Sequence, residues 1–572
     1  MRKVLQLFWL LVLIIKAGFS FAQIAPTSPA ADTIRTIELI RANVIKNRTV
    51  DSVTKLEILV GDVMVMEGTT KFYCDSAIIN RHLKTLEAFG NVRINQGDSL
   101  FTSSQYVKYL GNERVAYLKK NVKLTDKKAT LTTQDLEYNL ATGIGKYMNG
   151  GKVVNGKTVL TSTQGIYYED TKDVYFINKV DVVDPKTKIK ADSLLYNSQT
   201  QVLTFIGPTY IKNKDGDIFT TQGTYDLNKG NAFFGSRSMI KDSSGRVFTA
   251  NNIAYDEKTG QTQFEGQAII KDSANRFILV GNQIFSSKKD NSFLATKKPV
   301  LIFWEKNDTT YVAGDTLFSG FTKKKYDNNI IPEKDSGRNN STKNIVVNDS
   351  LPKDSTKILI PKKDSSTLKL ISKTKIINLN NADTSIRYFL AYHHVKIFND
   401  SLQAVSDSLF YSGADSVFRL FYDPVIWSGN SQVKGDTIFL YTKNKKAERV
   451  YVYENGIMIN KINSQFYNQV EGKTINGYFK DGVIDYIRAK GSPAESIYFV
   501  QDKDSAFTGM NRADGSVIDM YFIKQDLNKV KFVNDVHGKL YPIRQITKDQ
   551  KFLKKFAWLE KRRPKNKLEL FE

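Results

Sequence analysis

The stretch that decides the fold is KVDVVDPKTKIKADSLLYNSQTQVLTFIGP, residues 179–208. It opens with an alternating run and breaks at residues 184–187. An extended segment over residues 189–196 then leads through a turn at residues 197–200 into the apolar run 202–206. Apolar and polar residues that alternate with a period of two, between clusters of Gly, Asn, Asp and Pro, are typical of short strands joined by turns. The sequence therefore predicts two strands of about ten to twelve residues and two short turns.

The same plan recurs about every thirty residues along the chain. In most copies, Asp, Gln or Asn stands four residues ahead of an aromatic or large aliphatic residue, as Gln105 does ahead of Tyr109. A fixed period of this size is typical of stacked supersecondary units that bury their apolar faces on one another. We therefore expect an elongated repeat protein. Successive end points lie 28 to 30 residues apart, at Ile79, Tyr109, Tyr138, Tyr168, Tyr196, Tyr225, Tyr255 and Phe285.

Two apolar columns of the repeats are expected to face inward. Residues two apart that lead into an end point share one character, as Gln105, Val107 and Tyr109 do, whereas the residues between them share none. Successive side chains of a strand point to opposite faces, so the uniform column is predicted to be the inner one. The columns fit either a plain hydrophobic core or a core that also receives lipid. The candidate inward, lipid-binding residues are Val92, Ile94, Val107, Tyr109, Val122, Leu124, Leu136, Tyr138, Ile166, Tyr168, Val180, Val182, Leu194, Tyr196, Ile253 and Tyr255.

Glycines inside the long extended runs predict sharp bends. Gly90, Gly207, Gly235 and Gly266 each fall where a single long strand would otherwise continue. A bent strand contributes to two facing sheets at once. We therefore predict an all-β fold, an elongated repeat β-jellyroll or β-taco of antiparallel two-strand units in two blocks. A parallel β-helix is the alternative fold.

The composition divides the chain into repeat blocks and other segments. Residues 1–22 have a positive start, an apolar core and small residues before a cleavage site, which is typical of a secretory signal peptide. The first repeat block spans residues 37–321 and the second spans residues 385–546. Between them, residues 322–384 are dominated by Lys, Asp, Ser, Asn and Thr, a composition that predicts a disordered low-complexity linker.

The last residues, 547–572, form a basic tail. Thr547 is placed to cap a helix, so we predict a C-terminal helix here. This helix is expected to cover the last strands as a structural cap; docking on anionic headgroups or on a partner is the alternative. Its apolar side would consist of Phe552, Leu553, Phe556 and Leu559.

The charge and the few reactive side chains limit the classes of function. The formal net charge is +24, and removal of Arg2, Lys3 and Lys16 with the signal peptide leaves +21 (24 − 3). This excess favours an anionic partner. Because the chain is expected to be exported, a phosphorylated lipid or an anionic envelope polymer fits better than nucleic acid. One cysteine, Cys74, allows no internal disulfide, and four histidines supply metal chemistry poorly.

No motif of a catalytic or cofactor site stands out. The chain has no G-x-S-x-G, no H-E-x-x-H and no Cys–His pair with plausible spacing. Asp and Glu concentrate in turns, where Asp has a conformational reason to occur, although a glycosidase-like carboxylate pair stays open. We therefore predict a protein that is not an enzyme and that uses no cofactor and no metal.

The repeat copies, taken together, resemble a known family. Residues 189–197, IKADSLLYN, lead into an apolar strand that ends in Gly, and residues 90–94, GNVRI, show the step that follows such a strand. Residues 250–256, ANNIAYD, repeat the first part. Eight or more such copies in phase resemble the OstA-like, LptA-type proteins of lipopolysaccharide export. The resemblance covers most of residues 37–321 and, more loosely, residues 385–545.

That resemblance implies a fold, a ligand and a location. The family is a periplasmic β-jellyroll whose units pair end to end, forming a bridge that carries lipopolysaccharide from the inner to the outer membrane. Lipopolysaccharide is thus the implied ligand, with its acyl chains shielded in the groove. The implied partners are other lipopolysaccharide-transport proteins, or further copies of this chain head to tail, joined through strand edges. The implied location is the periplasm, in association with inner- or outer-membrane transport complexes.

Two other interpretations stay open. The first is a structural or adhesive repeat protein that binds envelope polysaccharide, with a filled core and carbohydrate contacts from outward aromatic residues such as Tyr167. The second is a β-helical polysaccharide lyase or hydrolase, which would carry a carboxylate or basic cluster on one outer face.

Overall fold

The structure divides the chain into two compact units. The computed structural model describes residues 36–51, 54–97, 100–305, 308–323, 385–443, 446–504 and 506–572. The predicted signal peptide, residues 1–22, and residues 324–384 of the predicted linker lie outside the described residues. Of the described residues, unit 1 contains those up to 214 and residues 224–228, and unit 2 contains residues 215–223 and those from 229 onward. The division falls inside the first predicted repeat block.

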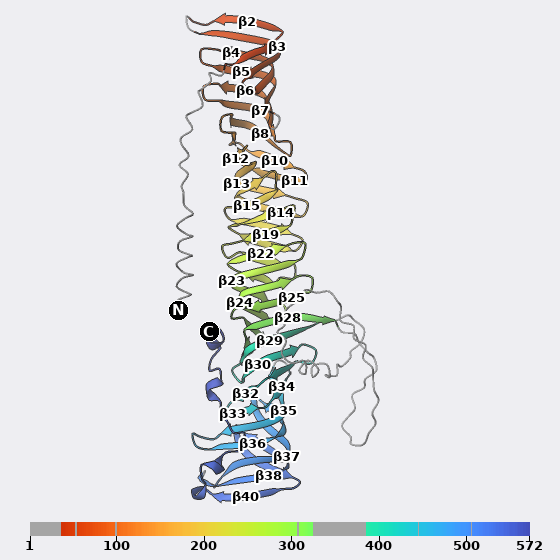
Figure 1. Ribbon diagram of the computed structural model, residues 1–572, viewed down its shortest axis with the longest axis vertical. Coiled ribbons are helices and arrows are strands. Elements are labelled where there is room, and N and C mark those ends of the chain that lie inside the picture. Colours follow the sequence, from red (N-terminus) through yellow and green to blue (C-terminus); the bar gives the residue numbers. More distant parts are fainter. Residues whose placement is uncertain are drawn as a thin grey trace, which may run out of the picture. The chain divides into compact units, whose positions relative to one another are not determined.

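Unit 1 is built from strands that follow one another as antiparallel hairpins (Figure 1). β3 pairs with β4, β4 with β5, and the series continues to β8. The strands of unit 1 are β1 (Glu38–Arg41), β2 (Val44–Thr49), β3 (Lys55–Glu67), β4 (Thr70–Asn80), β5 (Thr85–Gln96), β6 (Leu100–Leu110), β7 (Val115–Thr125), β8 (Ala129–Asn139), β9 (Ile144–Tyr147), β10 (Gly151–Asn155), β11 (Thr158–Ser162), β12 (Gln164–Tyr168), β13 (Asp173–Val183), β14 (Thr187–Asn197), β15 (Val202–Phe205) and β16 (Thr209–Asn213).

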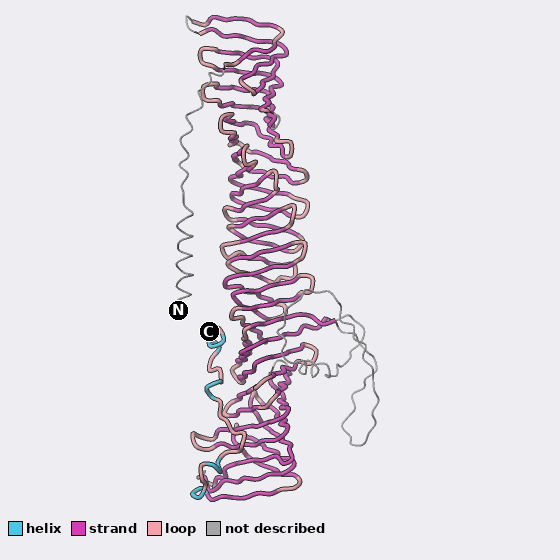
Figure 2. Tube along the Cα trace, viewed as in Figure 1, coloured by secondary structure: helices cyan, strands magenta, loops and turns pink. Residues whose placement is uncertain are grey.

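Unit 2 repeats this plan with further strands, which are joined by short loops except across residues 324–384 (Figure 2). β18 (Gly223–Asp226) contains residues of both units. The strands of unit 2 are β17 (Gly216–Thr220), β19 (Asn231–Phe234), β20 (Met239–Asp242), β21 (Val247–Thr249), β22 (Asn252–Asp256), β23 (Gln261–Asp272), β24 (Phe277–Ser287), β25 (Ser292–Thr296), β26 (Val300–Glu305), β27 (Asp308–Ala313), β28 (Thr316–Lys323), β29 (Ser385–Phe398), β30 (Gln403–Ser412), β31 (Val417–Phe421), β32 (Val425–Ser428), β33 (Ser431–Lys434), β34 (Thr437–Lys443), β35 (Lys446–Lys461), β36 (Tyr467–Lys480), β37 (Val483–Gln501), β38 (Phe507–Ile523), β39 (Asp526–Val533) and β40 (His537–Pro542).

The described strands pair antiparallel wherever their register is defined, in both units. This confirms the prediction of an all-β fold with antiparallel strands. The alternative, a parallel β-helix, is wrong for these strands, because its successive coils would pair in parallel.

Long strands turn a corner at two successive residues with positive φ. In β5 these residues are Gly90 (φ 69°) and Asn91 (φ 43°). The register with β6 is interrupted here, and the two residues stand opposite the single residue Gln105. A two-against-one arrangement is a β-bulge, which bends the strand. Each long strand therefore has two arms. We call the arm that holds residues 85–89 the first arm and the one that holds residues 92–96 the second arm, and we keep these names for the strands paired with them.

The corner recurs in both units, which confirms the predicted bends at Gly90 and Gly266. Gly207 and Gly235, by contrast, lie in breaks between shorter strands, and neither has a positive φ. Most other corners use residues with side chains in the left-handed conformation, where Asn, Asp and His are enriched. Equivalent pairs stand at Gly61–Asp62, Lys120–Asn121, Asn178–Lys179, Gly266–Gln267, His393–His394 and Glu454–Asn455.

The polar residue of the repeat motif belongs to the corner. Asp75 accepts a hydrogen bond from Nδ2 of Asn91 at 2.9 Å, and Asn455 donates in the same way to Asp436 at 2.8 Å. The predicted inward column is therefore wrong at its first position, since Gln105 is exposed. The bulge shifts the alternation at this point.

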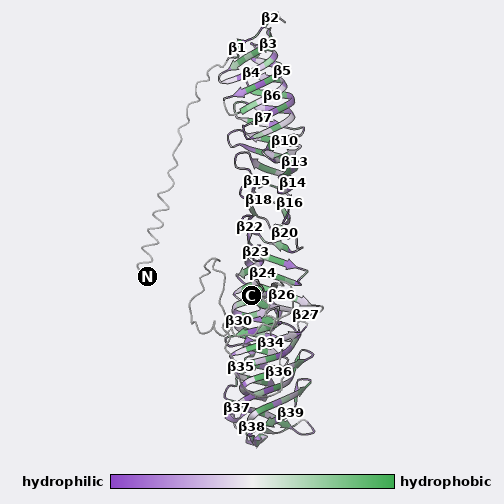
Figure 3. Ribbon diagram, turned by 90° about the vertical axis from the view of Figure 1, so that its right-hand side faces the viewer, coloured by the Kyte–Doolittle hydropathy of each residue, from purple (hydrophilic) through white to green (hydrophobic). Residues whose placement is uncertain are grey.

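The apolar positions of the predicted columns are mostly buried, and Figure 3 shows polar and apolar residues alternating along the ribbons. This confirms that these side chains face inward. The buried members are Val92, Ile94, Val107, Tyr109, Val122, Leu124, Leu136, Tyr138, Val180, Val182, Leu194, Tyr196 and Ile253.

Three members of the columns are only partly buried. Tyr255 is partly exposed near the end of β22. Ile166 and Tyr168 lie on the opposite face of β12 from the core, and Tyr167, which is 3% exposed, takes the inward place. The corner comes one residue earlier in this strand, and a one-residue shift reverses every side chain. The inward prediction is wrong for Ile166 and Tyr168, and Tyr167 is not the outward aromatic residue that the polysaccharide hypothesis needs.

The C-terminal tail is not the helix that the sequence predicts from Thr547. It contains only short 3-10 helices, separated by extended residues, and Phe552 has φ −130° and ψ 140°. The reason lies in two buried glutamines of unit 2 that bond the tail's backbone. The short helices are η1 (Ile543–Gln545), η2 (Asp549–Lys551), η3 (Glu560–Arg562) and η4 (Lys567–Leu570).

Each of the two glutamines acts on the tail as a neighbouring strand would. Nε2 of Gln469 donates to the carbonyl of Lys551 at 2.8 Å, and its Oε1 accepts from the Leu553 N–H at 2.9 Å. In the same way, Nε2 of Gln432 donates to the carbonyl of Ala557, and its Oε1 accepts from the Leu559 N–H, both at 2.8 Å. Backbone groups held by such side chains cannot form helical hydrogen bonds.

The tail covers strands of unit 2 with its apolar side chains. Leu553 packs in a cluster with Ile497 and Met510. Leu559 lies against a second cluster that contains Trp427, which has no exposed surface. The tail is therefore part of the folded unit. Among the described residues, no helix has the length and apolar character needed to cross a membrane.

Candidate functional site

Most of the predicted lipid-binding residues of unit 1 are buried in its interior. Val107, Tyr109 and Leu194 have no exposed surface. The rings of Phe72 and Tyr109 lie 5.2 Å apart, centroid to centroid. A ligand would reach these side chains only if the two arms moved apart. A lipid-binding role for them stays a prediction.

The tyrosine hydroxyls add polar contacts to this interior. Tyr138 donates to Glu169 at 2.6 Å, and the hydroxyls of Tyr147 and Ser162 lie 2.7 Å apart. Burial, assisted by the hydrogen bond to Glu169, raises the pKa of Tyr138. Burial also raises the pKa of Tyr196 to about 12. The hydroxyls of Tyr138 and Tyr196 therefore stay protonated at neutral pH, and that of Tyr138 acts as a hydrogen-bond donor.

Unit 2 holds a cavity of about 1260 Å³ between the two arms of its strands. β29 shows how the arms form its walls. Residues 385–392 of β29 pair with β28, and residues 396–398, beyond the corner at His393–His394, pair with β27. Ligand pockets for drug-sized molecules are roughly 300–1,000 Å³. The cavity is therefore large enough for a long or branched ligand.

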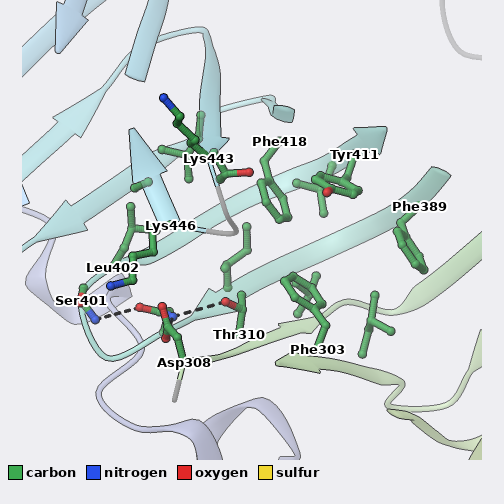
Figure 4. A pocket seen from close by; sticks show the side chains of 18 of the residues that line it. Phe303, Asp308, Thr310, Phe389, Ser401, Leu402, Tyr411, Phe418, Lys443 and Lys446 are labelled. Atoms are coloured by element: carbon green, nitrogen blue, oxygen red, sulfur yellow. Dashed lines mark hydrogen bonds between the residues drawn. The ribbon is translucent and has the colours of Figure 1, made fainter. Parts of the chain in front are cut away.

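The walls of the cavity are mainly aromatic and aliphatic (Figure 4). On the first arm, Tyr411 stands between Phe389 and Phe418, with ring centroids 6.1 and 4.5 Å away. Phe303 of the second arm faces Phe418 at 6.2 Å with nearly parallel rings. Leu409 completes this part of the wall. Such a surface suits hydrocarbon chains.

Polar groups border the apolar walls. Asn399 donates to Asp308, and Asn399 also accepts from the Ser401 N–H at 2.9 Å (Figure 4). Lys443 and Lys446 line the cavity from strands β34 and β35 and are exposed. Asp308, Asp400, Glu448 and Asp481 also line the cavity, and Nζ of Lys443 lies 3.6 Å from Oε1 of Glu448. The border therefore offers hydrogen-bonding groups and charges of both signs next to a hydrocarbon-lined space.

One cation stands inside the cavity wall itself. Nη1 of Arg387 donates to Oγ of Ser319 at 2.7 Å, and the guanidinium lies 4.2 Å from the ring centroid of Phe321. Burial, together with the nearby charge of Arg246, lowers the pKa of Arg387 to about 10. The group is still charged at neutral pH.

One stretch has the sequence pattern of a phosphate-binding loop but does not form such a loop. Residues 151–158, GKVVNGKT, match the G-x4-G-K-T spacing of a P-loop. In the structure they form a hairpin of β10 and β11 that turns at Gly156 (φ 58°). A P-loop leads from a strand into a helix whose N-terminus faces the phosphates, and β11 is followed by β12 instead.

The cavity residues are absent from the candidates found by sequence. Those candidates come from the first repeat block, whereas the walls are formed around the end of that block and the start of the second. One signal was present in the sequence RYFLA, residues 387–391. Arg387, Phe389 and Ala391 alternate along one face, so a cation occupies a position of an otherwise apolar column.

The described part of the chain contains no group of three or more His, Cys, Asp or Glu side chains placed to hold a metal ion. A family model described as OstA-like protein matches residues 35–192. No curated protein matches the chain. The match bears out the resemblance seen in the repeat motifs over that segment, which lies within unit 1.

Proposed function

We propose that this chain, which belongs to the OstA-like family through residues 35–192, shields the acyl chains of a lipopolysaccharide-type glycolipid between the arms of its strands. The family match indicates a role in lipopolysaccharide or envelope transport. The finer proposal is a periplasmic lipid-binding protein that forms part of a bridge to the outer membrane. It is a binding function, with no catalytic step.

The observation that carries the proposal is the aromatic-lined cavity of unit 2. Each methylene exposed to water costs about 0.8 kcal/mol, so a lipid with several acyl chains needs continuous cover while it moves. Phe303, Phe389 and Phe418 offer such cover, and the charged and hydrogen-bonding side chains of the border offer contacts to a polar headgroup. The net charge of +24 also suits an anionic glycolipid.

The proposed partners and location follow from the same function. We propose other lipopolysaccharide-transport proteins, or further copies of this chain head to tail, as partners, and the periplasm as the location. One edge supports pairing of this kind. β2 is exposed along its whole length and has β3 as its partner in the defined register. Exposed edge strands are able to add a strand from another chain.

Photo-crosslinking in cells tests the proposal with a matched pair. A crosslinking residue in place of Tyr411 points into the cavity, whereas one in place of the neighbouring Phe410 lies on the other face of β30. Position 411 should capture lipopolysaccharide and position 410 little. Equal capture at both positions, or none at either with normal export, would favour the structural, polysaccharide-binding alternative.

The same experiment asks whether the interior of unit 1 opens. Probes at Leu136 and Leu194 lie in the buried columns, and probes at Glu137 and Lys123 lie outside them. Capture at the buried pair alone would extend the lipid path into unit 1.

A further inference from the structure

Arg387 is an unusual occupant of the cavity wall in unit 2. It stands on the same face of β29 as Phe389 and Ala391, which line the cavity with it. Its guanidinium is surrounded by rings, with the centroids of Phe277 and Phe293 at 5.6 and 5.8 Å, in addition to Phe321. Cation–π contacts stabilise a cation in such surroundings only in part.

No described residue forms an ion pair with this guanidinium. The nearest influences are Asp272, which attracts it, and Arg246, which repels it. Asp272 is 2% exposed and accepts hydrogen bonds from the backbone and side chain of Asn275 at 2.9 and 2.8 Å. Arg246 is paired with Asp242 at 2.7 Å. The neighbouring carboxylates are therefore engaged elsewhere.

A partly buried guanidinium that has no ion-pair partner among the described residues is costly, and it has five N–H groups to satisfy. The described structure gives Arg387 one hydrogen-bond acceptor, Ser319. Arg387 lines the cavity of about 1260 Å³, so a ligand in the cavity could accept hydrogen bonds from its remaining N–H groups. An oxyanion in the cavity would satisfy both the charge and these donors, because guanidinium and phosphate or carboxylate match in a bidentate geometry.

We propose that Arg387 is the anion-binding point of the cavity, and that the ligand is an amphiphile whose oxyanion lies close to its hydrocarbon chain. The oxyanion, a phosphate or a carboxylate, binds the guanidinium. The chain lies along Phe389, Tyr411 and Phe418. This inference rests on the proposed function, since it names the group of the lipid that the cavity recognises.

Binding of simple probes to the purified full chain tests the inference. Dodecyl phosphate carries both parts of the ligand, dodecyl maltoside carries only the chain, and inorganic phosphate carries only the anion. Arg387→Met removes the charge. Arg449→Met is the matched control, because Arg449 also lies on aromatic rings of unit 2, at 5.3 Å from Tyr441 and 5.6 Å from Tyr451, and does not line the cavity.

The wild type should bind dodecyl phosphate more tightly than dodecyl maltoside, and inorganic phosphate should not displace it at equal concentration. Arg387→Met should weaken dodecyl phosphate by about ten- to a hundredfold, the effect of a charged hydrogen bond, and leave dodecyl maltoside within about twofold. Arg449→Met should change neither. If Arg387→Met does not fold, Arg387→Lys decides, with weaker phosphate binding expected because the bidentate fork is lost.

The contradicting outcomes separate this inference from the proposed function. Equal binding of both dodecyl probes, or unchanged phosphate binding in the Arg387 variant that is measured, would overturn the role of Arg387 and leave lipid binding intact. Displacement by inorganic phosphate would show a plain anion site and overturn the amphiphile. Failure of the wild type to bind either dodecyl probe would overturn the inference and the proposed function together.

Discussion

The second arms of the two units carry different outer faces. In unit 1, the start of β6 alternates, with Leu100 and Thr102 buried and Phe101 and Ser103 partly exposed. In unit 2, β32 is buried at all of its residues, and β30 begins with residues that are buried on both faces. The difference is the C-terminal tail, which covers the outer face of these strands in unit 2 through Leu559.

The repeat pattern in the sequence depends on whether one face or both faces of a strand are covered. Alternation marks a strand with one face in the core and one in water, whereas a strand covered on both faces reads as a continuous apolar run. The sequence VIW, residues 425–427, is such a run. The repeat becomes hard to recognise there, although the corners continue at His393–His394 and Glu454–Asn455.

Removal of residues 547–572 should have the largest effect, because it uncovers the outer face of the second arms in unit 2. It would expose the face around Trp427 and leave Gln432 and Gln469 without their backbone partners. The free energy of unfolding of unit 2 should fall on the order of 5 kcal/mol, from lost apolar burial and unsatisfied amides. Hydrogen exchange should show faster exchange in β33 and β36, and unchanged protection there would contradict the role given to the tail.

Trp427→Ala should have the next largest effect. Trp427 has no exposed surface and donates through Nε1 to Gln432 at 3.1 Å, so its loss should cost about 3–5 kcal/mol in a chemical denaturation experiment. Phe101→Ala, on the uncovered outer face of unit 1, should cost less than about 1 kcal/mol. Similar losses for the two variants would mean that the two outer faces do not differ as described.

A pair of glutamines gives a smaller contrast. Gln469 is fully buried and makes two hydrogen bonds to the tail, so Gln469→Ala should cost about 1–3 kcal/mol in the same experiment. Gln105 lies exposed at a corner, so Gln105→Ala should change stability by no more than about 0.5 kcal/mol. If Gln105→Ala lowered the free energy of unfolding by several kcal/mol, the corner glutamine would have a structural role of its own.

The smallest effects concern the corner, which both units share. Asn91 has φ 43° and bonds Asp75, so Asn91→Gly should stay within about 1 kcal/mol of the wild type, because glycine adopts this conformation readily. Asn91→Val should cost about 1–3 kcal/mol, since a branched side chain is strained there. Equal thermal stability of the two variants would argue against a left-handed corner at this residue.

Much of the fold could be predicted because it depends on local patterns. Period-two alternation and the thirty-residue repeat predicted antiparallel strands, and Gly90 and Gly266 marked two of the corners. Lys120–Asn121 and His393–His394 form equivalent corners without glycine, and the sequence gives only weak signals for them. The inward faces failed at β12, where the corner moves by one residue and reverses the faces of Ile166 and Tyr168.

The candidate site could not be predicted in the same way. The cavity exists because the arms of unit 2 stand apart around Phe389 and Phe418, and this spacing depends on packing between strands distant in sequence. The tail was missed for a similar reason. Its helical pattern around Phe552 is overruled by hydrogen bonds from Gln432 and Gln469, which lie 82 to 127 residues away from their partners in the sequence.

If a lipid lies between the arms of unit 2, some of that lipid should stay with the protein when it is purified from cells. Thr310 lines the cavity, whereas Thr309 points to the other face of β27, so Thr310→Trp places an indole ring in the cavity and Thr309→Trp is its control. After extraction and mass spectrometry, the wild type and Thr309→Trp should carry an acylated anionic glycolipid, and Thr310→Trp should carry much less. Equal amounts in the two variants, or no lipid on the wild type, would contradict the account.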